Sequence, residues 1–261
     1  MTTLVWAAIQ TQPRPVKTRN RATTMLFELL EPQAALGFAA VIDARDSPPG
    51  WFGGIPEDDL QPQLIACVEQ AFRAAFAAGL TAPPAACASA MLARAHAELA
   101  TLASNDPFVG SCAQAIVAVV APERIGVAWV GTARAYRVGA GGAALLTRDH
   151  TLREDWDGTP RTAAEIAGLP TGIITRALAG RGEPPAPGCV ELALGPGERL
   201  ALVGPCIPLE DAGVDPATLL EHAPPHVLAA TFADRAVRAA PGYPIAIAAI
   251  ELAGTGRVTT L

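Results

Sequence analysis

The chain has 261 residues, of which 51% are hydrophobic and 17% charged, so it is not a disordered chain and can bury a sizeable core. Its formal net charge is −6 and its 19 Lys and Arg residues are scattered, which excludes the basic patch that nucleic-acid binding requires. We therefore expect a globular protein, one domain over residues 1–261, with no nucleic-acid partner.

The composition also bears on location. The N-terminal residues lack the basic segment and the small-residue cleavage site of a secretory signal. The most apolar stretch, residues 67–102, is interrupted by charged residues and by Pro83 and Pro84, so it should not span a bilayer. Five cysteines form no CxxC pair, a pattern typical of reduced thiols in the cytosol. The sequence predicts a cytoplasmic protein with no membrane partner.

The first part of the chain is predicted to be sheet followed by helix. Three β-type runs, bounded by Pro or polar residues, lie at 4–9, 25–30 and 38–43. Residues 44–62 combine turn-forming and acidic residues, which predicts a long surface loop. Apolar residues then recur at helical spacing from Leu64 to Ala75 and from Met91 to Leu102, which predicts a helical hairpin.

The second part changes to the period of strands. Predicted strands lie at 113–120, 125–130, 133–138 and 144–147, and we expect them to form an antiparallel meander. Two further strands at 190–194 and 199–203, a helix at 226–239 and a closing strand at 245–252 complete the pattern. Blocks of strands that alternate with helical hairpins indicate the α+β class.

Five segments carry a family resemblance because of their order along the chain. Leu146 to Leu152 spells Leu-Thr-Arg-Asp-His-Thr-Leu; the others are Gly110–Ala113, Val130–Tyr136, Ile174–Leu178 and Pro196–Leu202. In chain order the five segments resemble successive motifs of the metal-dependent type 2C (PPM) serine/threonine protein phosphatases, and Leu146–Leu152 differs from the family pattern at one position. The resemblance implies a four-layer α/β/β/α sandwich of two antiparallel sheets flanked by helical hairpins.

The same resemblance implies a catalytic site that this chain has mostly lost. Family members hydrolyse phosphoserine and phosphothreonine with two Mn²⁺ or Mg²⁺ ions held by four aspartates. The matching positions here hold Ala22, Asp43, Pro205 and Tyr243, and Ala44 replaces a family glycine. One carboxylate cannot offset the four positive charges of two such ions, and Arg21 adds a further positive charge beside the site. No histidine in residues 44–54 matches the family's proton donor.

We therefore interpret the chain as a catalytically inactive, cofactor-free module that regulates or scaffolds by binding a protein, with a phosphoprotein or a Ser/Thr kinase as candidate partners. Its Ala-, Pro- and Arg-rich composition suggests a GC-rich bacterium, in which such domains accompany Ser/Thr phosphorylation signalling. The candidate contacts to phosphate or partner are Lys17, Arg19, Asp43, Trp51 and Phe52.

Several alternatives stay open from sequence. The chain could be an active phosphatase with a weak Mn or Mg site rebuilt around Asp43 and the acidic run at 57–59, or a structural subunit without a ligand. Asp43 suits either a binding role or a structural role at a strand end, and Lys17 and Arg19 suit phosphate contact or simple solvation. Asp149 and His150 are expected to tie a loop onto the sheet, and Cys206 to be an inert core thiol.

Overall fold

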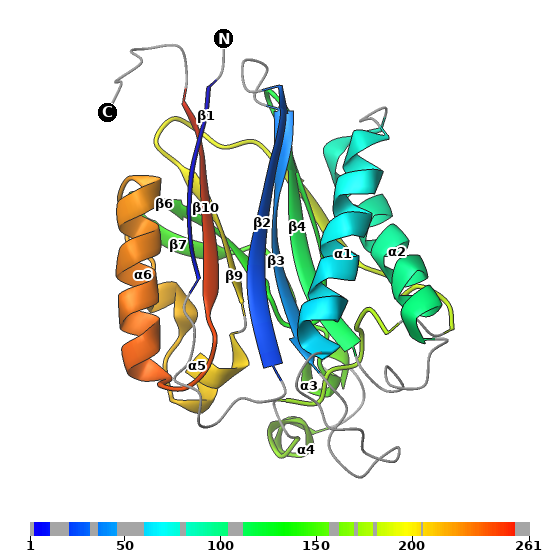
Figure 1. Cartoon of the computed structure of the whole chain (residues 1–261). Helices are drawn as coiled ribbons and strands as arrows, with labels where there is room; N and C mark the ends of the chain where they lie inside the picture. The colour runs from blue at the N-terminus through cyan, green and yellow to red at the C-terminus, as the bar shows by residue number, and fades with distance from the viewer. Residues whose placement is uncertain are drawn as a thin grey trace.

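The computed structural model describes residues 3–10, 21–31, 36–45, 60–78, 82–103, 112–156, 162–169, 172–179, 182–204 and 206–253. Within them, two five-stranded antiparallel sheets lie face to face and helices cover the outer face of each (Figure 1). The predicted α+β class and its α/β/β/α sandwich are confirmed.

The first sheet has the strand order β2 (Arg21–Glu31), β3 (Leu36–Arg45), β4 (Cys112–Val120), β5 (Ile125–Val130), β8 (Gly188–Leu192). Its outer face is covered by α1 (Leu60–Ala77) and α2 (Pro84–Ala103). In β4, Ala115 and Val117 pack toward these helices, while Ile116 and Ala118 pack toward the second sheet. Side chains alternate between the faces of a strand, so a strand between two layers must be apolar on both.

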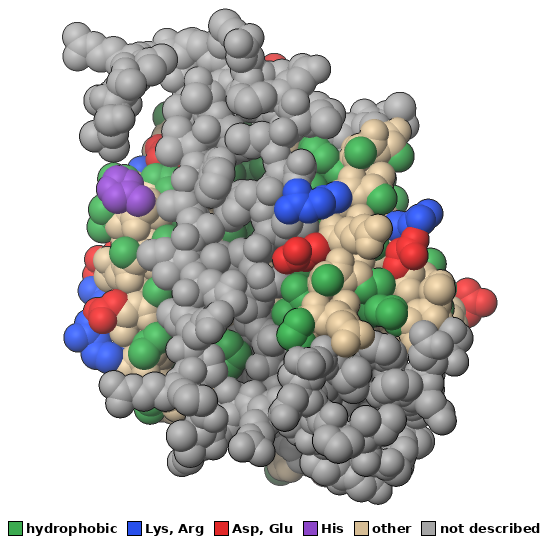
Figure 2. All heavy atoms as spheres, in the orientation of Figure 1, with side chains coloured by type: hydrophobic (Ala, Val, Ile, Leu, Met, Phe, Trp, Pro, Cys, Tyr) green, Lys and Arg blue, Asp and Glu red, His purple; other side chains and the backbone are tan. Residues whose placement is uncertain are grey.

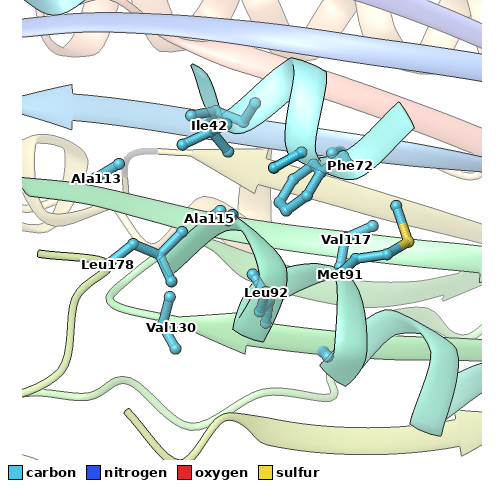
Figure 3. Packing of buried hydrophobic residues seen from close by; sticks show 14 of the residues in the cluster. Ile42, Phe72, Met91, Leu92, Ala113, Ala115, Val117, Val130 and Leu178 are labelled. Carbon is cyan, nitrogen blue, oxygen red and sulfur yellow. The ribbon is translucent and has the colours of Figure 1, made fainter. Parts of the chain in front are cut away.

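The helical hairpin fits closely because the strands below it carry small residues. Figure 3 shows Phe72, Met91 and Leu92 of the helices gathered over Ala115 and Val117. A Cβ added to Gly126 in β5 would lie 1.9 Å from the backbone nitrogen of Ala85, so only glycine lets the start of α2 lie on this strand. Over α1 and α2 in Figure 2, charged side chains of both signs are interspersed with hydrophobic ones.

The second sheet has the order β1 (Thr3–Gln10), β10 (Ala246–Ala253), β9 (Arg199–Gly204), β6 (Arg134–Gly139), β7 (Gly142–Leu145). Its outer face is covered by α6 (Pro225–Ala239), which buries Leu228, Phe232 and Ala236. The short helices α5 (Ile207–Asp211) and η3 (Pro216–Leu219) lie beside α6, and α3 (Leu152–Trp156) and α4 (Ala163–Ala167) follow β7 in the chain.

The predicted meander of residues 113–147 is wrong in one respect. β4 and β5 pair in the first sheet, but β6 and β7 pair in the second, so the chain changes sheets at Gly131, Thr132 and Ala133. Gly131 has a φ of 95°, which a residue with a side chain rarely adopts, and this turn directs the chain across the sandwich. The predicted bounds of the loop at 44–62 are wrong at both ends, because β3 reaches Arg45 and α1 begins at Leu60; residues 46–59 lie outside the described residues.

None of the helices in the described ranges is long and apolar enough to cross a membrane.

Candidate functional site

The sequence-predicted positions that the structure describes lie at or near the strand ends at one end of the sandwich, the lower end in Figure 1. β2 begins where β3 ends, and Ala22 lies opposite Ala44 in their ladder. β9 ends at Gly204, which pairs with the first residue of β10, three residues after Tyr243. A Cβ added to Gly204 would lie 3.0 Å from Cγ1 of Val41 in β3, so the two sheets touch here.

Not all of these positions can be placed. Lys17, Arg19, Trp51, Phe52 and Pro205, together with the acidic run at 57–59, lie outside the described residues. Ala22 is described by its backbone alone, whereas the Tyr243 side chain is 44% exposed.

Asp43 is the one carboxylate retained at the four positions that match the family's metal-binding aspartates, and it is buried in a polar network. Its exposure is 2%, and it lies directly opposite Gln114 in the ladder of β3 and β4. Nε2 of Gln114 donates to Oδ2 of Asp43 over 3.1 Å. Oε1 of the same amide accepts hydrogen bonds from the backbone nitrogen and the hydroxyl of Thr132, at 2.8 and 2.9 Å. The amide of Gln114 is thus satisfied at both ends, and it links the Asp43 carboxylate to the crossover between the sheets.

Gly131, the first residue of the crossover, lies directly against the Gln114 side-chain amide. A Cβ on Gly131 would lie 2.4 Å from Oε1 of Gln114, a distance that real Cβ atoms do not show. The glycine therefore meets two needs at once, since its φ is positive and its place beside Gln114 leaves no room for a side chain.

A second network joins β6 to the following loop and to α5. Nε and Nη2 of Arg134 donate to the two oxygens of Asp149 over 2.9 and 2.7 Å, and Nη1 donates to Glu210 over 2.6 Å. Arg134 and Asp149 are each only 9% exposed. Burial opposes the charge of Arg134, but the hydrogen bonds that it donates to Asp149 and Glu210, together with nearby negative charge, outweigh burial and raise the pKa of Arg134. Asp149 therefore anchors the loop to the sheet, as expected from sequence.

His150 holds the same loop through the crossover. Its backbone nitrogen donates to the carbonyl of Gly131 over 3.0 Å, and Nδ1 of its ring accepts from the Gly131 nitrogen over 3.2 Å. The imidazole stacks on the indole of Trp129, with ring centroids 6.2 Å apart. Burial, with a contribution from the charge of Arg176, lowers the pKa of His150 to about 4. The imidazole is therefore neutral at physiological pH.

Cys206 is fully buried beneath β9, as expected of an inert thiol. Burial raises the pKa of its thiol to about 12, so it is protonated and unreactive at neutral pH.

Two hollows flank the loop of residues 148–155. One, of about 360 Å³, lies on the side of Arg134 and Glu210, and the other, of about 350 Å³, lies between His150 and Arg176. Throughout the part of the chain that the structure describes, no three His, Cys, Asp or Glu side chains gather in a way that could hold a metal ion.

The comparisons with known proteins agree with this geometry. The family model for Protein phosphatase 2C matches residues 67–155. The catalytic domain of the serine/threonine protein phosphatase PstP in complex with two manganese ions superposes with a TM-score of 0.71 at 17% identity, covering 97% of this chain and 100% of that one. The chain has the PPM phosphatase fold.

Two other PPM structures give the same result. The Ser-Thr phosphatase MsPP from Mycobacterium smegmatis in complex with cacodylate has a TM-score of 0.65 at 22% identity, covering 95% of this chain and 98% of that one. Stp1 from Staphylococcus aureus has a TM-score of 0.73 at 15% identity, covering 97% and 96%. No curated protein sequence matches the chain.

The family match and the altered positions occupy different parts of the PPM fold. The match runs from Cys67 in α1 to Asp155 in α3, and it includes Gln114, Thr132, Arg134 and Asp149 but not their partners Asp43 and Glu210. The altered positions at residues 22, 205 and 243 lie outside it, as does the retained Asp43.

Proposed function

We propose that this protein is a catalytically inactive member of the PPM fold that regulates or scaffolds Ser/Thr phosphorylation signalling by binding a protein. The observation that carries the proposal is the chemistry of the side chains at the lower end of the sandwich. Ala22 offers no donor atom, and Tyr243 offers a phenol, which is a poor ligand for a hard dication. Only Asp43 brings a carboxylate to these positions.

The residues present do not fit a pair of Mn²⁺ or Mg²⁺ ions. The buried Asp43 carboxylate accepts a hydrogen bond from the Gln114 amide, and it is the one carboxylate among the four positions that match the family's metal ligands. Two dications a few ångströms apart also repel each other strongly, and a single carboxylate offsets one of their four charges. We therefore derive no catalytic step through a metal.

A protein partner suits what the fold retains. Relatives such as PstP and Stp1 are serine/threonine phosphatases, so a module with their fold and without their metal ligands would occupy phosphorylated sites or hold a signalling protein. A phosphoprotein or a Ser/Thr kinase is the partner that we propose, in the cytoplasm of a bacterium.

One observation favours a second candidate, an active phosphatase with a remodelled site. Asp43 is still placed at the end of the sandwich where β2, β3, β9 and β10 meet. Such a site would draw its other ligands from outside the described residues.

The turnover of p-nitrophenyl phosphate in the presence of Mn²⁺ or Mg²⁺ separates the two candidates. We expect wild type and Asp43→Asn to release p-nitrophenol at the rate of the buffer blank. A wild-type rate well above the blank that falls to it in Asp43→Asn would contradict the inactive assignment and support the remodelled site.

A further inference from the structure

The hollow of about 350 Å³ between His150 and Arg176 is separate from the positions of the altered metal site. It is lined by Trp129, Arg148, Asp149, His150, Glu154, Asp155, Arg176 and Gly188. None of these residues stands at the altered metal positions. Gly188 lies directly against the Trp129 ring, since a Cβ on Gly188 would be 2.3 Å from it.

The hydrogen bonds of His150 fix which ring nitrogen carries the proton. Nδ1 accepts from the Gly131 nitrogen over 3.2 Å, so it has no proton of its own. A neutral imidazole has one N–H group, and in His150 it must therefore be at Nε2. His150 lines the hollow although it is only 5% exposed, so Nε2–H is a buried donor that faces this space.

The group that Nε2 meets is another donor. Nη1 of Arg176 lies 3.4 Å from Nε2 of His150, and a guanidinium cannot accept a hydrogen bond. Across the residues that the structure describes, Nε2 has this contact and no acceptor. Two donors that face each other at this distance both need an acceptor atom placed beside them.

Arg176 is also held loosely by its other partners. Nη1 lies 3.3 Å from the carbonyl oxygen of Ala186, and Nη2 lies 3.6 Å from Oδ1 of Asp155. The contacts of Arg134 in the neighbouring network are 2.6 to 2.9 Å, as is usual for a charged pair. The Arg176 guanidinium therefore has capacity left for a stronger acceptor.

The acidic residues that line the hollow differ in how strongly they are paired with arginines. Both oxygens of Asp149 are bound by Arg134, and Glu154 pairs with Nε of Arg148 over 2.9 Å. Asp155 is the carboxylate left near Arg176, and at 3.6 Å it competes only weakly for the guanidinium.

We propose that this hollow binds a small oxyanion, a carboxylate or phosphate group, one oxygen of which accepts hydrogen bonds from both Nε2 of His150 and the guanidinium of Arg176. Such an acceptor satisfies both donors and adds a charge-assisted hydrogen bond. Asp155 is its competitor within the chain. The proposal does not depend on whether the protein hydrolyses phosphoesters, because it involves neither Asp43 nor a metal.

The test follows the imidazole Hε1 signals of the four histidines by NMR while inorganic phosphate or acetate is added to the metal-free protein at constant pH and ionic strength. The His150 signal, assigned from its loss in His150→Gln, should shift and saturate, while those of His96, His222 and His226 should not. Saturation by phosphate alone indicates a phosphate site, and saturation by both anions indicates a general carboxylate or phosphate site.

Three variants make the test specific. Arg176→Gln should lower the affinity for the anion at least tenfold. Asp155→Asn should raise this affinity several-fold, because it removes the carboxylate that competes for Arg176. Arg235→Gln, which alters a surface arginine of α6 paired with Glu221, should change nothing. An unchanged affinity in a folded Arg176→Gln, or no saturable shift with either anion, would overturn the proposal and leave a bridging water between the two donors.

Discussion

Asp43 is a buried carboxylate that accepts a hydrogen bond from the Gln114 amide, and it is the one carboxylate at the four positions that match the family's metal ligands. The Gln114 amide can point its nitrogen at Asp43 because Thr132 supplies two donors to its oxygen. Each group in this chain of contacts is at most 2% exposed, so loss of one partner leaves another without water to replace it.

Substitutions at Asp43 test this role. Asp43→Ala leaves Nε2 of Gln114 without this acceptor and should lower the free energy of unfolding by about 2 to 3 kcal/mol. Asp43→Asn keeps an acceptor oxygen and should cost about 1 kcal/mol less than the alanine. Urea unfolding monitored by circular dichroism measures both. Equal losses in the two variants would show that the hydrogen bond from Gln114 contributes nothing.

His150 gives the fold a dependence on pH. Its pKa is lowered from 6.5 to about 4 in the folded protein, so the unfolded chain takes up its proton first. Stability from this group is therefore complete above pH 6.5 and falls as the pH drops toward 4, by about 1 to 3 kcal/mol in total. In His150→Asn, whose amide oxygen replaces Nδ1 as the acceptor, the loss of unfolding free energy between pH 7 and pH 5 should be smaller. An unchanged loss would contradict this assignment.

These residue-scale contacts were only partly predictable. The resemblance to the PPM family located Asp43, and Asp149 and His150 were expected to hold a loop. Gln114 was missed, although a polar side chain within the apolar run of Cys112–Val120 is a signal that a buried carboxylate or amide lies opposite. No pattern in a single sequence pairs residue 43 with residue 114, because the register of two strands is set by the whole sheet.

At the scale of elements, the crossover between β5 and β6 decides which strands belong to which sheet. Strand periodicity located most of the strands in the chain, but a period of two is the same in either sheet, so it predicted one continuous meander. The short helices α3, α4 and α5, of five residues each, are too short to show a helical period. The two long helices of the hairpin were predicted well because each repeats its apolar face over several turns.

Gly131 is the residue on which the crossover depends. Gly131→Ala combines a positive φ with a Cβ 2.4 Å from Gln114, and it should lower the unfolding free energy by about 3 kcal/mol or more. Gly142→Ala is the matched control, because its φ is 105° and its Cβ would meet nothing within 4 Å. That variant should lose only about 1 kcal/mol, the cost of the backbone conformation. Similar losses in the two, measured by urea unfolding, would show that contact with Gln114 is unimportant.

At the scale of the whole molecule, the sandwich brings together strand ends that are more than 200 residues apart in sequence, from Ala22 in β2 to Ala246 in β10. The order of the motifs predicted this architecture because it runs along most of the chain. The chemistry at the strand ends followed from the identity of the residues there, whereas the hollow between His150 and Arg176 depends on loop geometry that no motif encodes.

The central claim is that this end of the sandwich no longer binds a pair of metal ions. Calorimetric titration of Mn²⁺ into the purified protein, beside Asp43→Asn, tests it most directly. We predict no saturable heat in either protein at millimolar Mn²⁺. Micromolar binding of two ions to wild type that is lost in Asp43→Asn would contradict the account and identify a rebuilt metal centre at Asp43.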